Sequence, residues 1–284
     1  MGEGPLWDVR QNRLYWLDIV EGKIHRYDPA THKNETFAVG KYVSSVTPTI
    51  RGDFLITKGH AIYKWRPEHK MEKVISAEQR MAGNRFNDGK CDPAGRFWVG
   101  SMDMKEERQS GSLYRLSADL SIKKMCSGLT VSNGIDWSPG NETMYHVDSP
   151  TRRIFAYDFD LDGGTISRKR VAITIPEGNG FPDGITVDCE GNIWVAQWGG
   201  SRISRWEPEG RLLEEISVPA SQVSSCTFGG RNLDTLYVTT ARYGIGRSQV
   251  NNEVHAGSLF SIVPGVRGRA ANKFNDSRKY SYSL

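Results

Sequence analysis

The sequence lacks any long hydrophobic run. Nowhere in its 284 residues does an apolar stretch approach the roughly 18 that a membrane-spanning helix needs. Its start has neither the basic segment nor the apolar core of a signal peptide. Hydrophobic residues make up 38% of the chain and charged residues 25%, as in soluble globular proteins. We therefore expect a cytoplasmic protein without a membrane partner.

Cysteine is also scarce. The chain has only Cys91, Cys126, Cys189 and Cys226. They are widely scattered, and no two form a Cys-x-x-Cys pair, which excludes a zinc ribbon and a dithiol redox motif. We expect all four to be reduced.

Excess charge is small and confined to one end. The net charge is +4, and the residues from Pro264 onward carry all of it. The charged residues of this tail are Arg267, Arg269, Lys273, Asp276, Arg278 and Lys279. The rest of the chain is therefore neutral overall, which argues against a nucleic-acid partner. We expect residues 265–284 to form a basic, solvated tail that either closes the fold or is disordered.

Helical periodicity and a serine nucleophile are missing too. No long segment repeats its apolar residues with a helical period, whereas residues 193–198 and 236–240 consist of the aromatic, β-branched and small residues that favour strands. No Gly-x-Ser-x-Gly nucleophile elbow occurs, so covalent serine catalysis has little support. These absences favour an all-β protein with another kind of chemistry.

What the sequence does have is an internal repeat. Its unit is a polar residue before glycine, an apolar stretch, a turn such as Asp-x-x-Gly, an aromatic strand and a second strand ending in Tyr or Trp. Equivalent positions stand 42 to 50 residues apart and are Gly4, Val46, Gly89, Gly134, Gly184 and Cys226. Six such copies predict one six-bladed β-propeller, with four-stranded blades around a central channel, over residues 1–284. An all-β sandwich or two small barrels would not predict this even spacing.

Each repeat opens with an oxygen-bearing side chain. These residues are Glu3, Ser45, Asp88, Asn133, Asp183 and Ser225. The innermost strands of a propeller run beside its channel, so we expect the six residues to form a ring at one channel mouth. Converging carboxylates repel and desolvate one another unless a cation joins them, and their oxygens suit Ca²⁺, Mg²⁺ or Mn²⁺. The alternative is that each Asp or Asn before glycine only makes a local turn.

Several motifs around these positions are specific in combination. They are Gly2-Glu3-Gly4-Pro5-Leu6-Trp7, Asn84-Arg85-Phe86-Asn87-Asp88-Gly89-Lys90, Ser132-Asn133-Gly134-Ile135-Asp136-Trp137-Ser138, Pro182-Asp183-Gly184 and Cys226-Thr227-Phe228-Gly229-Gly230. Through them nearly the whole chain resembles the senescence marker protein, gluconolactonase and luciferin-regenerating enzyme family, to which regucalcin belongs. The family fold is a six-bladed propeller, in agreement with the repeat.

The resemblance also implies an activity and a set of site residues. Family members hydrolyse aldonolactones such as gluconolactone with one divalent metal, and calcium, zinc, manganese, magnesium or iron(II) serves in different members. We expect calcium or zinc here, a sugar lactone as the partner molecule and no obligate protein partner. Glu3, Asn133 and Asp183 match the metal ligands, and Arg85 and Asn87 match residues that contact substrate.

Two features depart from the family pattern. Members carry a further strand before Gly-Glu-Gly-Pro that helps to close the ring, so we expect the last blade to close differently here. The regucalcin branch places an acidic substrate contact after the position of Gly100, where this chain has Lys105 and Glu106. We include both residues among the substrate-binding candidates.

A mechanism follows from these residues. A metal polarises the lactone carbonyl, Asp183 acts as the base for the attacking water, and Arg85 and Asn87 orient the sugar hydroxyls. One alternative is a calcium-binding propeller with little turnover, which would not require Arg85 or Asn87. Another is a luciferin-regenerating or phosphotriesterase-like hydrolase with a more apolar pocket, which Phe181 and Trp198 would line. Arg85 by itself could also be an ordinary surface arginine.

Overall fold

The computed structural model describes residues 1–246 and 252–277, and in this part of the chain almost every regular element is a strand. A single helical turn, η1 (Ser149–Thr151), interrupts them. The strands are β1 (Gly2–Asp8), β2 (Arg13–Asp18), β3 (Lys23–Asp28), β4 (Lys33–Ala38), β5 (Val43–Pro48), β6 (Phe54–Lys58), β7 (Ala61–Trp65), β8 (Glu72–Ser76), β9 (Asn84–Cys91), β10 (Phe97–Asp103), β11 (Gly111–Leu116), β12 (Ile122–Leu129), β13 (Ser132–Trp137), β14 (Thr143–Asp148), β15 (Arg153–Asp160), β16 (Thr165–Thr174), β17 (Phe181–Val187), β18 (Ile193–Trp198), β19 (Arg202–Trp206), β20 (Leu212–Ser217), β21 (Gln222–Gly229), β22 (Thr235–Ala241) and β23 (Leu259–Ile262). The expectation of an all-β protein is confirmed.

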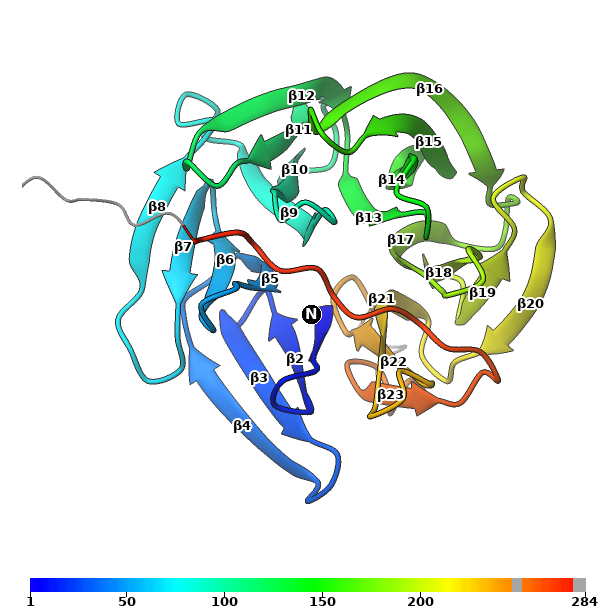
Figure 1. Ribbon diagram of the computed structural model, residues 1–284. Coiled ribbons are helices and arrows are strands. Elements are labelled where there is room, and N and C mark those ends of the chain that lie inside the picture. Colours follow the sequence, from blue (N-terminus) through cyan, green and yellow to red (C-terminus); the bar gives the residue numbers. More distant parts are fainter. Residues whose placement is uncertain (247–251, 278–284) are drawn as a thin grey trace, which may run out of the picture.

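The strands form antiparallel sheets arranged around a central space (Figure 1). Four sheets have four strands each: β1 to β4, β5 to β8, β9 to β12 and β13 to β16. A seven-stranded sheet holds β17 to β23, in which the single pair Trp198↔Gln222 joins β18 to β21. The first strands of successive units, β1, β5, β9, β13, β17 and β21, pack side by side, and β21 returns to β1. These inner strands therefore line the channel.

The hydrophobic core lies between neighbouring sheets rather than in one central mass. Trp98 of β10 packs edge to face against Trp137 of β13, with ring centroids 6.3 Å apart. The Asp-x-x-Gly turns anchor such aromatic residues, because Asp92 accepts a hydrogen bond from the indole of Trp98 and Asp188 accepts one from Trp194. The repeated turn and aromatic residues are thus structural, as the sequence predicts.

Each inner strand carries a β-bulge near its start. The register shifts between Glu3 and Leu6 on β1, between Ser132 and Ile135 on β13, and between Pro182 and Ile185 on β17. Similar shifts occur where β5, β9 and β21 pair with their neighbours. A bulge re-aims the side chains on either side of it. The inner strands therefore present different faces to the channel before and after this point.

A strap formed by residues 264–277 crosses one end of the channel (Figure 1). It bonds to successive units: Gly268 N–H donates to Leu233 O, Asn272 to Cys91 O, and Asn275 N–H to Gly95 O. Phe274 is 1% exposed and forms a parallel bridge with Thr49. The described part of the basic tail therefore packs across the channel, with Arg267 exposed on it; residues 278–284 lie outside the described residues.

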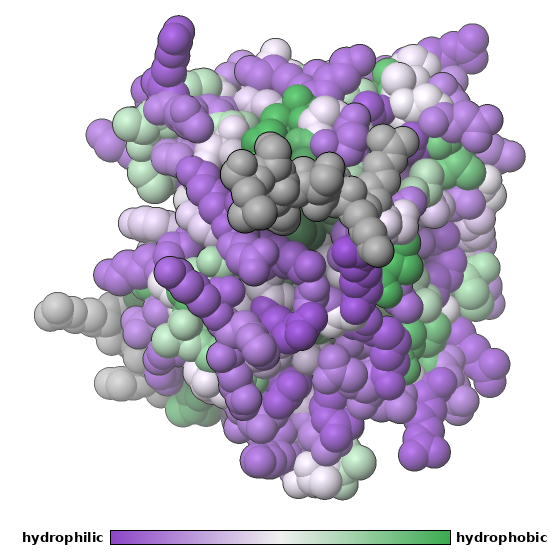
Figure 2. Space-filling view, turned by 60° about the vertical axis from the view of Figure 1, so that its left-hand side comes forward, coloured by the Kyte–Doolittle hydropathy of each residue, from purple (hydrophilic) through white to green (hydrophobic). Residues whose placement is uncertain are grey.

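The surface in Figure 2 is mostly hydrophilic, with small apolar patches. In the described part of the chain, no helix has the length and apolar character that crossing a membrane requires. All four cysteines are free, and Cys91 and Cys226 are buried.

Candidate functional site

A cavity of about 400 Å³ opens at the end of the channel where the inner strands begin. It gathers five of the residues singled out in the sequence, namely Glu3, Arg85, Asn87, Asn133 and Asp183. Each is no more than 8% exposed. The rest of the lining is Met1, Met102, Glu106, Val131, Ser149, Pro150, Phe181, Trp198, Gln222, Tyr243 and Gly244. Strands far apart in the sequence thus bring these five polar side chains together.

Two buried carboxylates dominate the electrostatics of this cavity. Burial raises the pKa of Glu3 to about 8, and the nearby Asp88 adds to the shift. Burial also raises the pKa of Asp183 well above its usual value, and the charges of Glu3 and Asp88 raise it further. The Oδ1 atom of Asp183 is buried and has no hydrogen-bond partner. The site is therefore short of positive charge.

Arg85 does not supply that charge through a salt bridge. Its Nη1 donates to Phe86 O at 3.0 Å and to Asn87 Oδ1 at 2.7 Å. Burial lowers the pKa of Arg85, while the charge of Glu3 acts in the opposite direction. The reading of Arg85 as an ordinary surface arginine is wrong, because the side chain is buried in the cavity wall.

Asn87 and Asn133 form a connected pair. Asn87 Nδ2 donates to Asn133 Oδ1 at 3.0 Å and to Ser132 O at 3.0 Å. Asn133 Nδ2 donates in turn to Ser149 Oγ at 2.9 Å, and Ser149 Oγ donates to Pro182 O at 2.7 Å. Each carbonyl oxygen has two lone pairs, so Asn133 Oδ1 keeps one for another partner.

The local sequence explains why these side chains sit in strands and not in turns. Asn133 and Asp183 lie within β13 and β17, beside the bulges, and each precedes a glycine. A Cβ on Gly134 would lie 2.6 Å from Asp183 O, and one on Gly184 would clash with Ser225 Oγ. Glycine is therefore required by the close approach of neighbouring inner strands. The local-turn alternative is wrong for these two positions.

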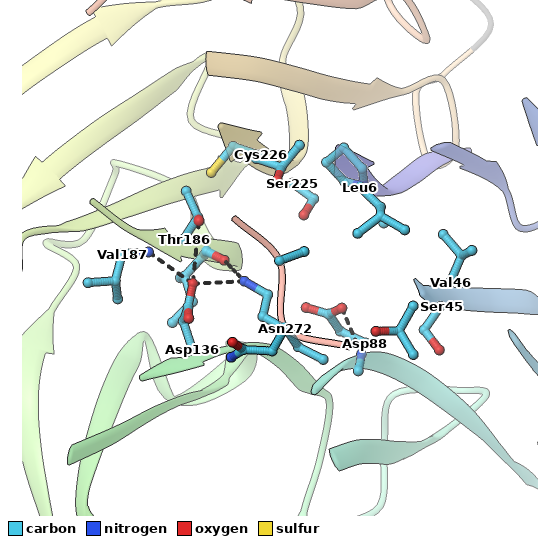
Figure 3. Close-up of a pocket in the computed structure, with 18 of the residues that line it drawn as sticks. Leu6, Ser45, Val46, Asp88, Asp136, Thr186, Val187, Ser225, Cys226 and Asn272 are labelled. Carbon is cyan, nitrogen blue, oxygen red and sulfur yellow. Dashed lines mark hydrogen bonds and ion pairs between the residues drawn. The ribbon is translucent and has the colours of Figure 1, made fainter. Parts of the chain in front are cut away.

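The expected single ring divides into two groups. Ser45, Asp88 and Ser225 line a second cavity of about 70 Å³, together with the later residues of the inner strands and Arg269 to Asn272 of the strap. Figure 3 shows this cavity, with Ser45, Asp88 and Ser225 directed into it. The two groups differ in their place at the bulges, since Asn133 and Asp183 lie within the bulges of β13 and β17, whereas Ser45 and Ser225 follow those of β5 and β21. The expectation of six oxygen donors at one mouth is thus wrong.

The two carboxylates of the second cavity differ, because burial raises the pKa of Asp88 whereas Asp136 has counter-charges beside it. Asp136 Oδ2 accepts a hydrogen bond from Lys90 Nζ at 2.9 Å and one from Val187 N–H at 3.0 Å (Figure 3). Arg269 lies 3.4 Å from the other carboxylate oxygen. Burial acts to raise the pKa of Asp136, but Lys90 and Arg269 outweigh it and lower the pKa below its usual value. This carboxylate already has its counter-charges.

The two residues proposed from the segment after Gly100 have different positions. Glu106 lines the larger cavity, and its charge acts on both Arg85 and Asp183. Lys105 is exposed and is not among the residues that line this cavity. The structure therefore brings Glu106 to the site but not Lys105.

Other residues that line the larger cavity do not stand at the repeat positions. Ser149, Gln222 and Tyr243 were not predicted, because Ser149 and Tyr243 lie outside the inner strands and Gln222 precedes its ring position. Phe181 and Trp198, considered as wall residues for a more apolar substrate, do line the cavity. Arg152 lies 4.3 Å above the ring of Phe181 and holds it at the rim.

The donor set fits a hard divalent cation. Glu3 and Asp183 offer buried carboxylate oxygens, Asn133 offers a free lone pair, and the unpartnered Asp183 Oδ1 needs a positive partner. Among the described residues, no group of three or more His, Cys, Asp or Glu side chains is placed to hold a metal ion. The amide of Asn133 is therefore an essential third ligand of the set we consider.

Comparisons with known proteins identify the family of this chain. The family model for the SMP-30/Gluconolactonase/LRE-like region matches residues 1–242. The chain is 37% identical to the proposed sugar lactone lactonase YvrE of Bacillus subtilis, over 92% of this chain and 90% of the relative.

Two solved structures superpose closely on the chain. A luciferin-regenerating enzyme has a TM-score of 0.91 and 35% identity, covering 96% of this chain and 95% of the other. A calcium-binding protein, regucalcin, from Agrobacterium tumefaciens has a TM-score of 0.93 and 26% identity, covering 97% and 94%. Both similarities extend over the whole fold and are not confined to one sheet.

Proposed function

Because the chain belongs to the SMP-30/gluconolactonase/LRE-like family, we propose that it hydrolyses sugar lactones, such as gluconolactone, to the corresponding aldonic acids. This makes it a carboxylic ester hydrolase that depends on one divalent metal. We favour calcium or zinc, held by Glu3, Asn133 and Asp183. The relatives named as a lactonase and as a calcium-binding protein support both parts of the proposal.

The observation that carries the proposal is a pair of buried carboxylates that form no salt bridge with any of the described residues. Burying an ionised carboxylate is costly unless it is paired or coordinates a metal. Glu3 and Asp183 face an open cavity, and no side chain of the described residues forms a salt bridge with either. A purely structural pair would instead resemble Asp136, which has Lys90 and Arg269 beside it.

The chemistry requires a Lewis acid and a base. A divalent cation, when bound, polarises the lactone carbonyl and stabilises the negative charge that forms on its oxygen. Asp183 accepts a proton from the water that attacks the carbonyl carbon. It returns this proton to the ring oxygen as the ester bond breaks, so the product is the open hydroxy acid.

Substrate is positioned by the polar wall of the cavity. The guanidinium of Arg85 presents a planar set of donors, of which Nη1 is used internally, so other N–H groups can bind sugar hydroxyls. Asn87 holds the neighbouring amide and shapes the same wall. Glu106 provides an acceptor at the rim. Such a set suits a small polyhydroxylated ring.

A metal-replacement experiment tests the proposal. Metal-stripped protein would be refilled with calcium, zinc, manganese, magnesium or iron(II) singly, and each form assayed on a panel of sugar lactones. We expect hydrolysis to be lost with the metal and restored by at least one ion. Undiminished hydrolysis by metal-free protein would overturn the metal dependence, and no hydrolysis by any form would overturn the activity.

A second candidate function has an observation of its own. Phe181 and Trp198 place aromatic surface on the cavity wall, which suits a bulkier, less polar substrate of the luciferin-regenerating type. Adding an aromatic lactone or ester to the same panel separates the candidates. Metal binding without turnover of any substrate would favour the calcium-binding alternative.

We also propose that β21–β23 form the last of six blades, which closes against β1. The packing of β21 on both β17 and β1 supports this count. The free cysteines accord with a cytoplasmic location. A fractionation experiment on the native source would test the location.

A further inference from the structure

The amide of Asn133 can serve a cation in only one of its two orientations. Its oxygen can bind a metal, whereas its NH₂ group carries only hydrogen-bond donors and would repel one. In the described structure the oxygen and nitrogen are held by different neighbours: Oδ1 accepts from Asn87 Nδ2, and Nδ2 donates to Ser149 Oγ. The groups that hold Asn87 and Ser149 in place therefore determine the orientation of the Asn133 amide.

One half of the orientation is set by groups with a single hydrogen-bonding role. Arg85 can only donate, and its Nη1 binds Asn87 Oδ1 at 2.7 Å. The carbonyl of Ser132 can only accept, and it binds Asn87 Nδ2 at 3.0 Å. Asn87 is thus fixed from both sides, and it must donate to Asn133 Oδ1.

The other half depends on a residue outside the inner strands. Ser149, in η1, donates its hydroxyl proton to Pro182 O at 2.7 Å. Since that carbonyl can only accept, the lone pairs of Ser149 Oγ face Asn133 Nδ2. Pro182 directly precedes Asp183, so the same hydroxyl links the segments that carry two of the ligands.

We propose that Ser149 is a positioning residue for the metal centre: it holds the amide of Asn133 with its oxygen toward the cation and ties it to the backbone before Asp183. This role rests on the metal site of the proposed function. Without the Ser149 hydroxyl, Asn133 Nδ2 loses its acceptor, and the amide is held on one side only, by Asn87 Nδ2. Partners of this kind that orient metal ligands are typically worth 10- to 100-fold in metal affinity.

The first test measures metal binding and not activity. Metal-stripped wild type, Ser149→Ala and Ser149→Thr would be titrated calorimetrically with calcium, zinc, manganese and magnesium singly. We expect Ser149→Ala to weaken the binding of the preferred ion by about tenfold or more, and Ser149→Thr to keep it within about threefold because its hydroxyl remains. The thermal midpoint of metal-free Ser149→Ala should stay within a few degrees of wild type, since the side chain is only partly buried.

A double-substitution cycle separates orientation from packing. In an Asn133→Asp background the side chain at position 133 ends in two equivalent oxygens. Either oxygen can bind the cation, so this side chain needs no partner to orient it. Ser149→Ala should then cause little further loss, within about twofold, although it removes the same atoms. An equal loss in both backgrounds would overturn the orienting role and leave Ser149 as a packing residue.

The outcomes for this inference and for the proposed function are distinct. If wild type binds a cation and Ser149→Ala binds it equally well, the role of Ser149 is overturned and the metal site stands. If wild type binds neither these four ions nor iron(II), the metal centre itself is overturned, and the role of Ser149 with it.

Discussion

The two cavities of the channel are built from the same inner strands, yet Asp136 at one end and Glu3 and Asp183 at the other differ in their charge partners. Near the strap, Asp136 is paired with Lys90 and Arg269, and its pKa is lowered. At the other end, which we call the unbalanced end, Glu3 and Asp183 form no salt bridge with any of the described residues, and their pKa values are raised. Burying an ionised carboxylate without a partner is costly. The unbalanced end is therefore where we propose that a cation binds.

The largest effect at the unbalanced end is expected from Asp183→Asn, which should lower the rate of lactone hydrolysis. The amide keeps an oxygen ligand but cannot accept a proton at neutral pH. We expect kcat on gluconolactone to fall by about 10² to 10⁴ in variant protein shown to contain metal. A metal-loaded variant within about threefold of wild type would rule out Asp183 as the base.

The matched change at the balanced end is Asp136→Asn, which should leave the chemistry intact and weaken the fold. It removes the counter-charge of Lys90 and puts an NH₂ group near Val187 N–H. We expect the free energy of unfolding to fall by about 3 kcal/mol, measured by urea denaturation at pH 7. The loss should shrink as the pH falls toward the pKa of the wild-type carboxyl, because protonation removes the same charge. Loss of lactonase activity without loss of stability would contradict this division of roles.

Replacing the carboxylate of Glu3 by an amide should raise the free energy of unfolding of metal-free protein, whereas the same change at Asp136 should lower it. Between the unfolded pKa near 4.5 and the folded pKa near 8, the folded state binds the extra proton, so its stability declines as the pH rises through this range. Glu3→Gln carries no ionisable group at this position. We expect it to be more stable than metal-free wild type at pH 8 by roughly 2 kcal/mol, and to bind metal more weakly. A less stable variant at pH 8 would show that Glu3 has a counter-charge after all.

A smaller loss of activity is expected from Arg85→Lys. This variant separates the binding of sugar, which it should weaken, from the binding of metal, which it should leave unchanged. An ammonium cannot reproduce the planar donors of the guanidinium. We expect kcat/KM on sugar lactones to fall about tenfold, equivalent to about 1.4 kcal/mol, with little change in metal affinity. Lys105→Ala serves as the control, because Lys105 is an exposed cation outside the cavity lining. Equal losses on an unsubstituted lactone would show that Arg85 does not act through the sugar hydroxyls.

The repeat made most of the fold predictable. Its spacing located the inner strands, and the polar residues before glycine located Asn133 and Asp183. The sequence could not show which end of the channel each position faces, because strand alternation carries no sign of the bulge beside Glu3, Ser132 or Pro182. The bulge of β9 spans Phe86 to Gly89, so Asn87 and not Asp88 occupies the position that Asn133 and Asp183 have in their bulges.

Two further failures have physical causes. Ser149 lies in a connection between strands, and only the folded chain brings it to Asn133. Lys105 was chosen by counting along a connection between β10 and β11, where length and direction are free to vary.

The strap also bears on how molecules would reach the larger cavity. Residues 264–277 cross one end of the channel above a cavity of about 70 Å³, and among the described residues the cavity of about 400 Å³ opens at the other end. On the proposed function, lactone and acid product would share this opening, and each acid molecule would have to leave before the next lactone binds. Accumulated acid would then compete with lactone for the cavity and slow its hydrolysis.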